Sequence, residues 1–133
     1  RVRSAATCHS AASQAYRIDC EEIGRALTYS GDTGPCEEVR ELAQGCDLLI
    51  HEATYLHVQE PMYGHSTAGQ AAQIAAAAGC GALALVHRDR EQPEAPDLYE
   101  AEVRAHYNGM WWLAYVGQSV TLSLAGLSIV GDR

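Results

Sequence analysis

The stretch Leu48-Leu49-Ile50-His51-Glu52 decides how this chain folds. Three consecutive apolar residues are typical of a strand that is buried on both faces, as in a parallel sheet covered by helices. Two further strand-like runs lie on either side of it in the sequence, at 25–30 and at 82–87. Each of the three runs ends at, or within two residues of, an acidic or imidazole side chain. This repeated change from apolar to polar residues indicates one shared functional edge.

Two helices are predicted between these strands. The first covers 35–44, with a proline at its start, acidic residues in its first turn and a glycine after its end. The second covers 67–78, where Thr67 and Gln70 have the spacing of a capping box. The order β-α-β-α-β over 25–87 predicts a parallel sheet with right-handed crossovers, and therefore an α/β fold.

The flanking regions add further elements. The alternating pattern of Gln14–Cys20 predicts another strand, and a third helix is expected over about 97–107. Near the end of the chain, 111–116 and 120–124 are expected to form a hairpin that turns through Gly117-Gln118.

The strand order brings the chemically active residues together. Open α/β sheets bind ligands at the carboxyl ends of their parallel strands. Asp32, Glu52 and His87 fall at such ends, and His65 directly precedes the second helix on the same edge. Carboxylate and imidazole groups are ligands for divalent metals, so this edge is a candidate metal site.

Composition narrows the class of protein. The 133 residues are 47% hydrophobic and 20% charged, as in an ordinary globular domain, and the net charge of −8 disfavours binding of nucleic acid by this segment alone. The five cysteines show no C-x-x-C pair, which indicates reduced thiols in a cytoplasmic protein. No apolar run approaches the roughly 20 residues of a membrane span, so no membrane partner is expected.

Two of the candidate metal ligands have simpler interpretations. Asp32 lies in a Gly-Asp-Thr-Gly turn just before a helix and is also suited to cap that helix. His87 would be an exposed histidine where its strand reaches the surface. The nearby Arg88 and Arg90 are candidates to hold an anionic substrate.

Glu52 ends a buried strand, where a carboxylate normally needs a partner. Glu52 and His65 would form a carboxylate–imidazole pair suited to proton transfer. His51 points to the other face of the sheet if the strand continues, so we expect a structural role for it. His9, next to a cysteine in a β-type segment, is interpreted as a core residue or as a support for a metal ligand.

Residues 9–87 resemble the C-terminal half of a metallo-β-lactamase-fold hydrolase of the ribonuclease Z-like branch. The resemblance rests on Tyr16-Arg17-Ile18, Gly31-Asp32-Thr33-Gly34, His51-Glu52-Ala53-Thr54 and Gly64-His65-Ser66-Thr67, which stand in the order and spacing of that family. It implies half of a four-layer αβ/βα sandwich, with a mixed sheet and helices on one face. Residues 1–133 would then be a single segment of a longer domain.

The resemblance also implies roles for the site residues. Asp32 would bridge two metal ions, usually zinc with manganese or iron as alternatives, and His87 would be a terminal metal ligand. His65, oriented by Glu52, would stabilise or protonate the phosphate and the leaving oxygen. A hydroxide held by the metal ions would attack a phosphodiester or small ester substrate.

The His-x-His-x-Asp-His cluster of the family is absent from these residues, as is a further histidine ligand. We therefore expect this segment to be inactive alone and to need a missing N-terminal half or a second chain, with a homodimer as one form. The rival hypothesis from another class is a non-catalytic half-fold that acts as a dimerisation or binding module through its exposed sheet face.

Overall fold

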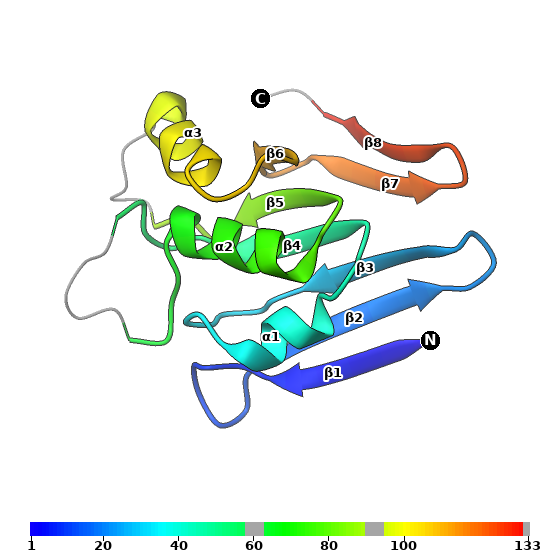
Figure 1. Ribbon diagram of the computed structural model, residues 1–133, viewed down its shortest axis with the longest axis horizontal. Helices are drawn as coiled ribbons and strands as arrows, with labels where there is room; N and C mark the ends of the chain where they lie inside the picture. Colours follow the sequence, from blue (N-terminus) through cyan, green and yellow to red (C-terminus); the bar gives the residue numbers. More distant parts are fainter. Residues whose placement is uncertain (58–62, 90–94, 132–133) are drawn as a thin grey trace.

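The computed structural model describes residues 1–57, 63–89 and 95–131. Figure 1 shows a twisted sheet with helices against one face and a separate two-stranded hairpin at the C-terminal end. The elements follow in this order: β1 (Val2–Ala6), β2 (Gln14–Cys20), β3 (Arg25–Tyr29), α1 (Glu37–Leu42), β4 (Leu48–Glu52), α2 (Ala68–Ala78), β5 (Ala82–Val86), α3 (Pro96–Arg104), β6 (Met110–Leu113), β7 (Ser119–Ser123) and β8 (Gly126–Val130).

The main sheet is mixed, as expected. Its strands lie in the order β1-β2-β3-β4-β5-β6. The first two pairings are antiparallel, and β3, β4, β5 and β6 pair in parallel. The predicted β-α-β-α-β unit is therefore confirmed, with β4 at the centre of the parallel part and buried on both faces.

The ends of α2 match its local sequence closely, and α1 and α3 are shorter than predicted. In α2 the Thr67 side chain accepts from the Gln70 N–H, the Gln70 side chain accepts from the Thr67 N–H, and Gly79 ends the helix in a left-handed conformation. The first helix is shorter than the predicted 35–44 at both ends, because it begins after Cys36 and ends at Leu42. The third, α3, is also shorter than the predicted 97–107 at its C-terminal end.

The predicted hairpin of 111–116 with 120–124 is wrong. Strand β6 pairs in parallel with β5, and β7 pairs instead with β8 through Ser123 and Gly126. The physical reason is the open edge of β5, whose backbone N–H and C=O groups need partners. Since β6 fills that edge, β7 finds its partner later in the chain.

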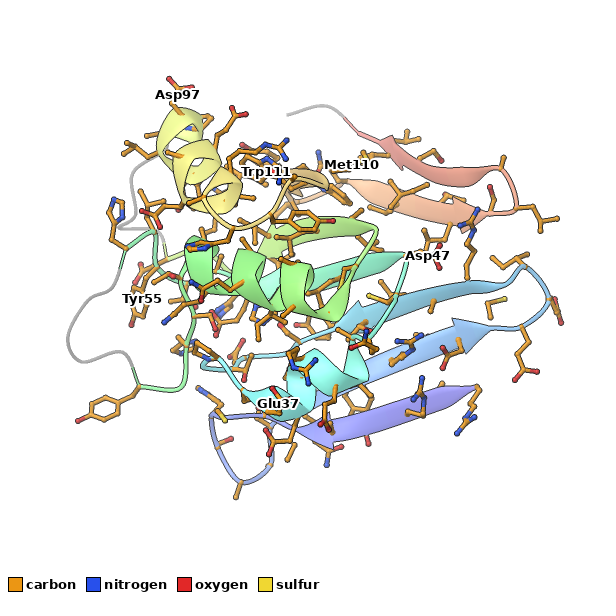
Figure 2. All side chains as sticks on the ribbon, in the orientation of Figure 1. Glu37, Asp47, Tyr55, Asp97, Met110 and Trp111 are labelled. Atoms are coloured by element: carbon orange, nitrogen blue, oxygen red, sulfur yellow. The ribbon has the colours of Figure 1, made fainter. Side chains whose placement is uncertain are left out.

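Two apolar clusters lie on opposite faces of the sheet. The larger one packs the three helices against residues such as Leu49, Leu83 and Leu85. The smaller one contains Leu48 and the alanines of β5, and the β7–β8 hairpin packs against it. Figure 2 shows Asp47 and Tyr55 at opposite ends of β4. The candidate site lies at the Tyr55 end.

The face opposite the helices is only partly covered. In the register of β2 with β3, Tyr16 lies opposite Tyr29 and Ile18 lies opposite Leu27, which packs on the smaller cluster. Tyr16, Ile18 and Tyr29 are 45–47% exposed. This uncovered apolar face was expected for half of a four-layer sandwich. Within the described residues, no helix is both long and apolar enough to cross a membrane.

Candidate metal and catalytic site

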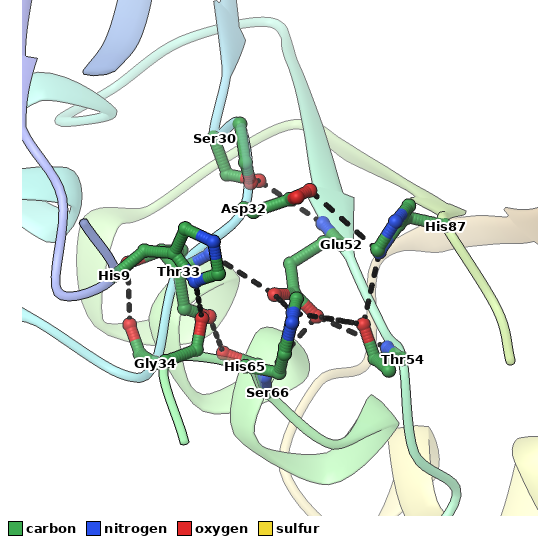
Figure 3. Close-up of polar contacts among 12 residues, drawn as sticks. His9, Ser30, Asp32, Thr33, Gly34, Glu52, Thr54, His65, Ser66 and His87 are labelled. Atoms are coloured by element: carbon green, nitrogen blue, oxygen red, sulfur yellow. Dashed lines mark hydrogen bonds and ion pairs between the residues drawn. The ribbon is translucent and has the colours of Figure 1, made fainter. Parts of the chain in front are cut away.

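The candidate site lies where β3, β4 and β5 reach their carboxyl ends (Figure 3). Asp32 follows β3, Glu52 is the last residue of β4, and His87 directly follows β5. His65 comes from the loop before α2. These four residues, which lie far apart in the sequence, meet at one edge of the sheet as the strand order predicts.

Glu52 is the centre of this edge. Its side chain is buried, with the residue only 1% exposed, and it accepts five hydrogen bonds. Oε1 accepts from the Thr33 N–H at 3.0 Å and from His65 Nδ1 at 2.7 Å. Oε2 accepts from the Thr54 N–H at 3.0 Å, the Thr54 hydroxyl at 2.8 Å and the Ser66 N–H at 3.1 Å. One carboxylate thus joins three loops.

These hydrogen bonds define which histidine nitrogens are free. A carboxylate can only accept, so His65 carries its proton on Nδ1 and leaves Nε2 unprotonated. The Thr54 hydroxyl donates its one proton to Glu52 and lies 3.0 Å from His87 Nδ1, so its oxygen accepts from that nitrogen. His87 Nε2 is then also free. The two imidazole rings stack with their centroids 5.6 Å apart.

Asp32 is held by its backbone and not by its carboxylate. Its carbonyl oxygen accepts from the hydroxyls of Thr7 and Ser13, each at 3.0 Å. Its carboxylate is 3.6 Å from His87 Nδ1, and its side chain is 39% exposed. The interpretation of Asp32 as a helix cap is wrong, because α1 starts after Cys36 and has no side-chain cap.

Asp32, His65 and His87 together fit a divalent cation. Each offers one ligand atom, and these atoms lie within 4.8 Å of one another. One carboxylate and two imidazoles form a donor set that suits zinc and neighbouring transition metals. Catalytic zinc sites commonly have three protein ligands and an open position.

His87 has an unusual backbone. Its φ of 52° is the positive value that side-chain-bearing residues rarely adopt. The segment after it is fixed on two sides: the Asp89 N–H donates to the Thr54 carbonyl at 3.0 Å, and the Arg88 guanidinium lies over the rings of Tyr99 and Tyr115 at 5.8 and 5.2 Å. Arg88 therefore packs on tyrosines, where we expected a contact for an anion. Arg90 lies outside the described residues.

Other residues of the site were assigned differently from the sequence. His9 is exposed and does not belong to the core. Its Nδ1 lies 2.9 Å from the Gly64 carbonyl, and its ring centroid is 4.9 Å from that of His65. Sequence reasoning missed Thr54, although its position two residues after a buried glutamate is a signal for a local side-chain hydrogen bond.

His51 has the structural position that was expected. It is fully buried, and its Nδ1 donates to the Glu52 carbonyl at 2.8 Å. Burial lowers the pKa of His51 below its usual value, and the interactions with Glu52 only partly offset this effect. His51 is therefore neutral near pH 7.

Residues 3–88 match the family model described as a beta-lactamase superfamily domain. The chain belongs to this superfamily. Curated relatives named Ribonuclease Z include one from Brevibacillus brevis, 54% identical over 67 residues, which are 48% of this chain and 21% of that protein. A relative of the same name from Myxococcus xanthus is 36% identical over 104 residues, which are 76% of this chain and 34% of that protein. This chain therefore spans about a fifth to a third of the length of these relatives.

Solved structures of superfamily members show the same fold. The metallo-beta-lactamase fold protein YhfI from Bacillus subtilis superposes with a TM-score of 0.75 at 24% identity, over 85% of this chain and 46% of that one. A long form RNase Z from yeast superposes with a TM-score of 0.67 at 24% identity, over 86% of this chain and 16% of that one. The expected metallo-β-lactamase fold is confirmed.

Proposed function

We propose that this chain is part of a metal-dependent phosphodiester hydrolase of the ribonuclease Z-like kind. The observation that carries the proposal is the meeting of Asp32, His65 and His87 beside the buried Glu52. The names of the matched relatives support RNA as the first phosphodiester to test. Precursor transfer RNA, a cyclic nucleotide and a small ester are the substrates to compare.

Asp32 and His87 would hold the metal, for which zinc is our first choice and manganese or iron the alternatives. The side chain of Asp32 is 39% exposed, so its carboxylate is accessible to a cation, and His87 has a free Nε2. When bound, such cations neutralise charge on the phosphate and lower the pKa of a coordinated water. His9 is the residue of this chain best placed to extend the donor set, since its ring lies against His65 and its Nδ1–H is bound to a carbonyl.

His65 would move the proton. Its Nδ1–H is held by Glu52 at 2.7 Å, so the ring cannot turn and Nε2 faces away from the carboxylate. In its protonated state, His65 would donate from Nε2 to the leaving oxygen or stabilise charge on the phosphate. Glu52 therefore positions His65 and does not touch the substrate.

A further part of the proposal is that residues 1–133 form one segment of a larger active unit. The donor set lacks the His-x-His-x-Asp-His ligands of the family, and the exposed Tyr16, Ile18 and Tyr29 need a cover. An N-terminal half or a second copy of the chain would cover this face. Only the N-terminal half would also supply the missing metal ligands. The rival, a non-catalytic binding module, would use the same face and would need no metal.

The test is metal analysis and a phosphodiesterase assay on the complete protein. Asp32→Ala should lose bound metal, with an affinity at least about 100-fold lower, together with activity. His65→Ala should lower turnover by roughly 10²–10⁴-fold. Because Asp32 and His87 remain, it should weaken metal binding less than Asp32→Ala does. His106→Ala, at an exposed histidine beside Gln73, is the matched control and should change neither property. Full activity in the Asp32 variant would contradict the role of Asp32 as a metal ligand, whereas a complete protein with neither bound metal nor activity would favour the binding module.

A further inference from the structure

A second group of metal-type ligands lies outside the Asp32 site. Cys8 follows β1, Cys36 directly precedes α1, and Glu38 is in the first turn of α1. The two sulfur atoms and one carboxylate oxygen lie within 4.8 Å of one another. Cys8 and Glu38 are exposed whereas Cys36 is buried, so solvent reaches the group from one side.

The two cysteines are held in place by the backbone and by Thr33. The Gly34 N–H donates to the Cys8 carbonyl at 3.0 Å, and the Cys8 N–H donates to Thr33 Oγ1 at 3.1 Å. The same hydroxyl lies 3.5 Å from Cys36 Sγ. The backbone contacts of Cys8 and the Thr33 hydroxyl therefore hold the two sulfur atoms close together, and the Cys8 thiol itself hydrogen-bonds with Cys36.

We propose that Cys8, Cys36 and Glu38 form a separate site for a thiophilic divalent cation of the zinc or cadmium type. Thiolate sulfur and carboxylate oxygen are both ligands that such ions accept, and water would fill the fourth position. With metal–ligand bonds of about 2.0–2.3 Å, ligand atoms around a tetrahedral ion lie roughly 3.3–3.8 Å apart. The exposed Glu38 side chain can close the small remaining difference by rotation.

The other cysteine pair shows why a cation is favoured over a simple disulfide. Cys46 and Cys80 are buried, and their sulfur atoms lie 3.5 Å apart in a thiol–thiol hydrogen bond. Among the described residues they have no third ligand that would complete a metal group. Cys8 and Cys36 differ from them by the adjacent Glu38 and by access to solvent. A cation would gain a third ligand from Glu38, which a disulfide would not use.

The proposed ion would fasten two loops that border the Asp32 site. Cys8 precedes His9, and Thr33 connects Cys8 to Glu52 through its N–H. Binding at the cysteines would therefore stabilise the loop of His9 against the loop of Asp32. The proposal does not depend on hydrolytic activity, because its ligands are separate from Asp32, His65 and His87.

The experiment is a cadmium titration of the whole protein under a phosphine reductant, followed by ultraviolet thiolate-to-cadmium absorption. One tight equivalent with this absorption is expected. Cys8→Ser and Cys36→Ser should each weaken it at least about 100-fold, and Glu38→Gln should weaken it by about 10-fold. Cys20→Ser, at an exposed cysteine on β2, is the matched control and should leave it unchanged.

The Asp32→Ala variant separates this proposal from the proposed function, since it should keep the cadmium–thiolate absorption even when activity is lost. Unchanged absorption in both the Cys8 and Cys36 variants would overturn the proposal. Loss of the absorption only when Cys46 or Cys80 is replaced would also overturn it. So would a reduced protein that gives no thiolate absorption but forms a Cys8–Cys36 disulfide in air.

Discussion

Two carboxylates at the same edge of the sheet have opposite surroundings. Glu52 is 1% exposed and accepts five hydrogen bonds from three loops. Asp32 has a side chain that is 39% exposed, and its carboxylate approaches His87 only at 3.6 Å. The comparison indicates two different roles. Glu52 holds the loops of the site together, and Asp32 stays available to a ligand.

The largest expected effect is on stability at Glu52. Glu52→Ala leaves three buried backbone N–H groups without acceptors, and we expect the free energy of unfolding to fall by about 4 kcal/mol. Glu52→Gln keeps an acceptor oxygen and should cost about 2 kcal/mol. Urea denaturation of the metal-free protein measures both.

Asp32→Ala is the matched variant for this comparison. Its carboxylate makes no short hydrogen bond among the described residues, so the unfolding free energy should change by about 0.5 kcal/mol or less. Equal losses in the Asp32 and Glu52 variants would show that the two carboxylates do not differ in this way.

Thr54 connects the two carboxylates and gives the next largest effect. Its hydroxyl donates to Glu52 and accepts from His87 Nδ1, the nitrogen that faces Asp32. Thr54→Val should lower the unfolding free energy by about 2 kcal/mol and leave His87 without its partner. Thr54→Ser keeps the hydroxyl and should retain most of the stability. NMR of the imidazole nitrogens would show whether the Nδ1–H tautomer of His87 is lost only in the valine variant.

The pH dependence of the unfolding free energy tests the buried surroundings of Glu52 through His51, which donates to the Glu52 carbonyl. Burial lowers the pKa of His51 in the folded protein below the unfolded value of 6.5. Below that pH the unfolded chain takes up a proton that the folded protein does not, so stability falls as pH decreases. The slope should reach about 1.4 kcal/mol per pH unit, until the lowered folded pKa is passed.

The control for this titration is His51→Asn, which can still donate a hydrogen bond but does not titrate. Its unfolding free energy should depend less on pH below 6.5 than that of the parent chain. The same slope in both proteins would assign the pH dependence to other groups.

The smallest effect is expected at the surface. His57 Nδ1 lies 2.8 Å from Glu102, and the two side chains are 58% and 31% exposed. Glu102→Gln should change the unfolding free energy by about 0.5 kcal/mol or less, because exposed ion pairs contribute little. A loss comparable with that of the Glu52 variants would mean that burial does not explain the difference between the two carboxylates.

Much of the fold follows from local sequence. The apolar run of β4 and the capping box of α2 are short-range signals, and both predicted the elements that formed. The partner of β7 was not predictable in this way. Whether β6 joins β5 or β7 depends on an open sheet edge that is created by residues 28 positions earlier in the chain.

The sequence was sufficient to predict the edge of the sheet at which the candidate site lies. Strand order alone brought Asp32, Glu52 and His87 to one end of the sheet. The position of His9 was not predictable, because its place beside His65 depends on how the loop after β1 packs against Gly64. The hydrogen bonds of Thr54 depend on side-chain directions at the end of β4, which the sequence pattern does not define.

The hydrogen bonds of Glu52 also have a consequence for sequence variation. Three of its five donors are backbone N–H groups, at Thr33, Thr54 and Ser66. Every residue except proline carries such a group, so the glutamate recognises the path of each loop and not its side chains. Related proteins can therefore vary these loops to suit new substrates while a single acidic residue keeps them in register, and proline is the one residue type that these three positions should exclude.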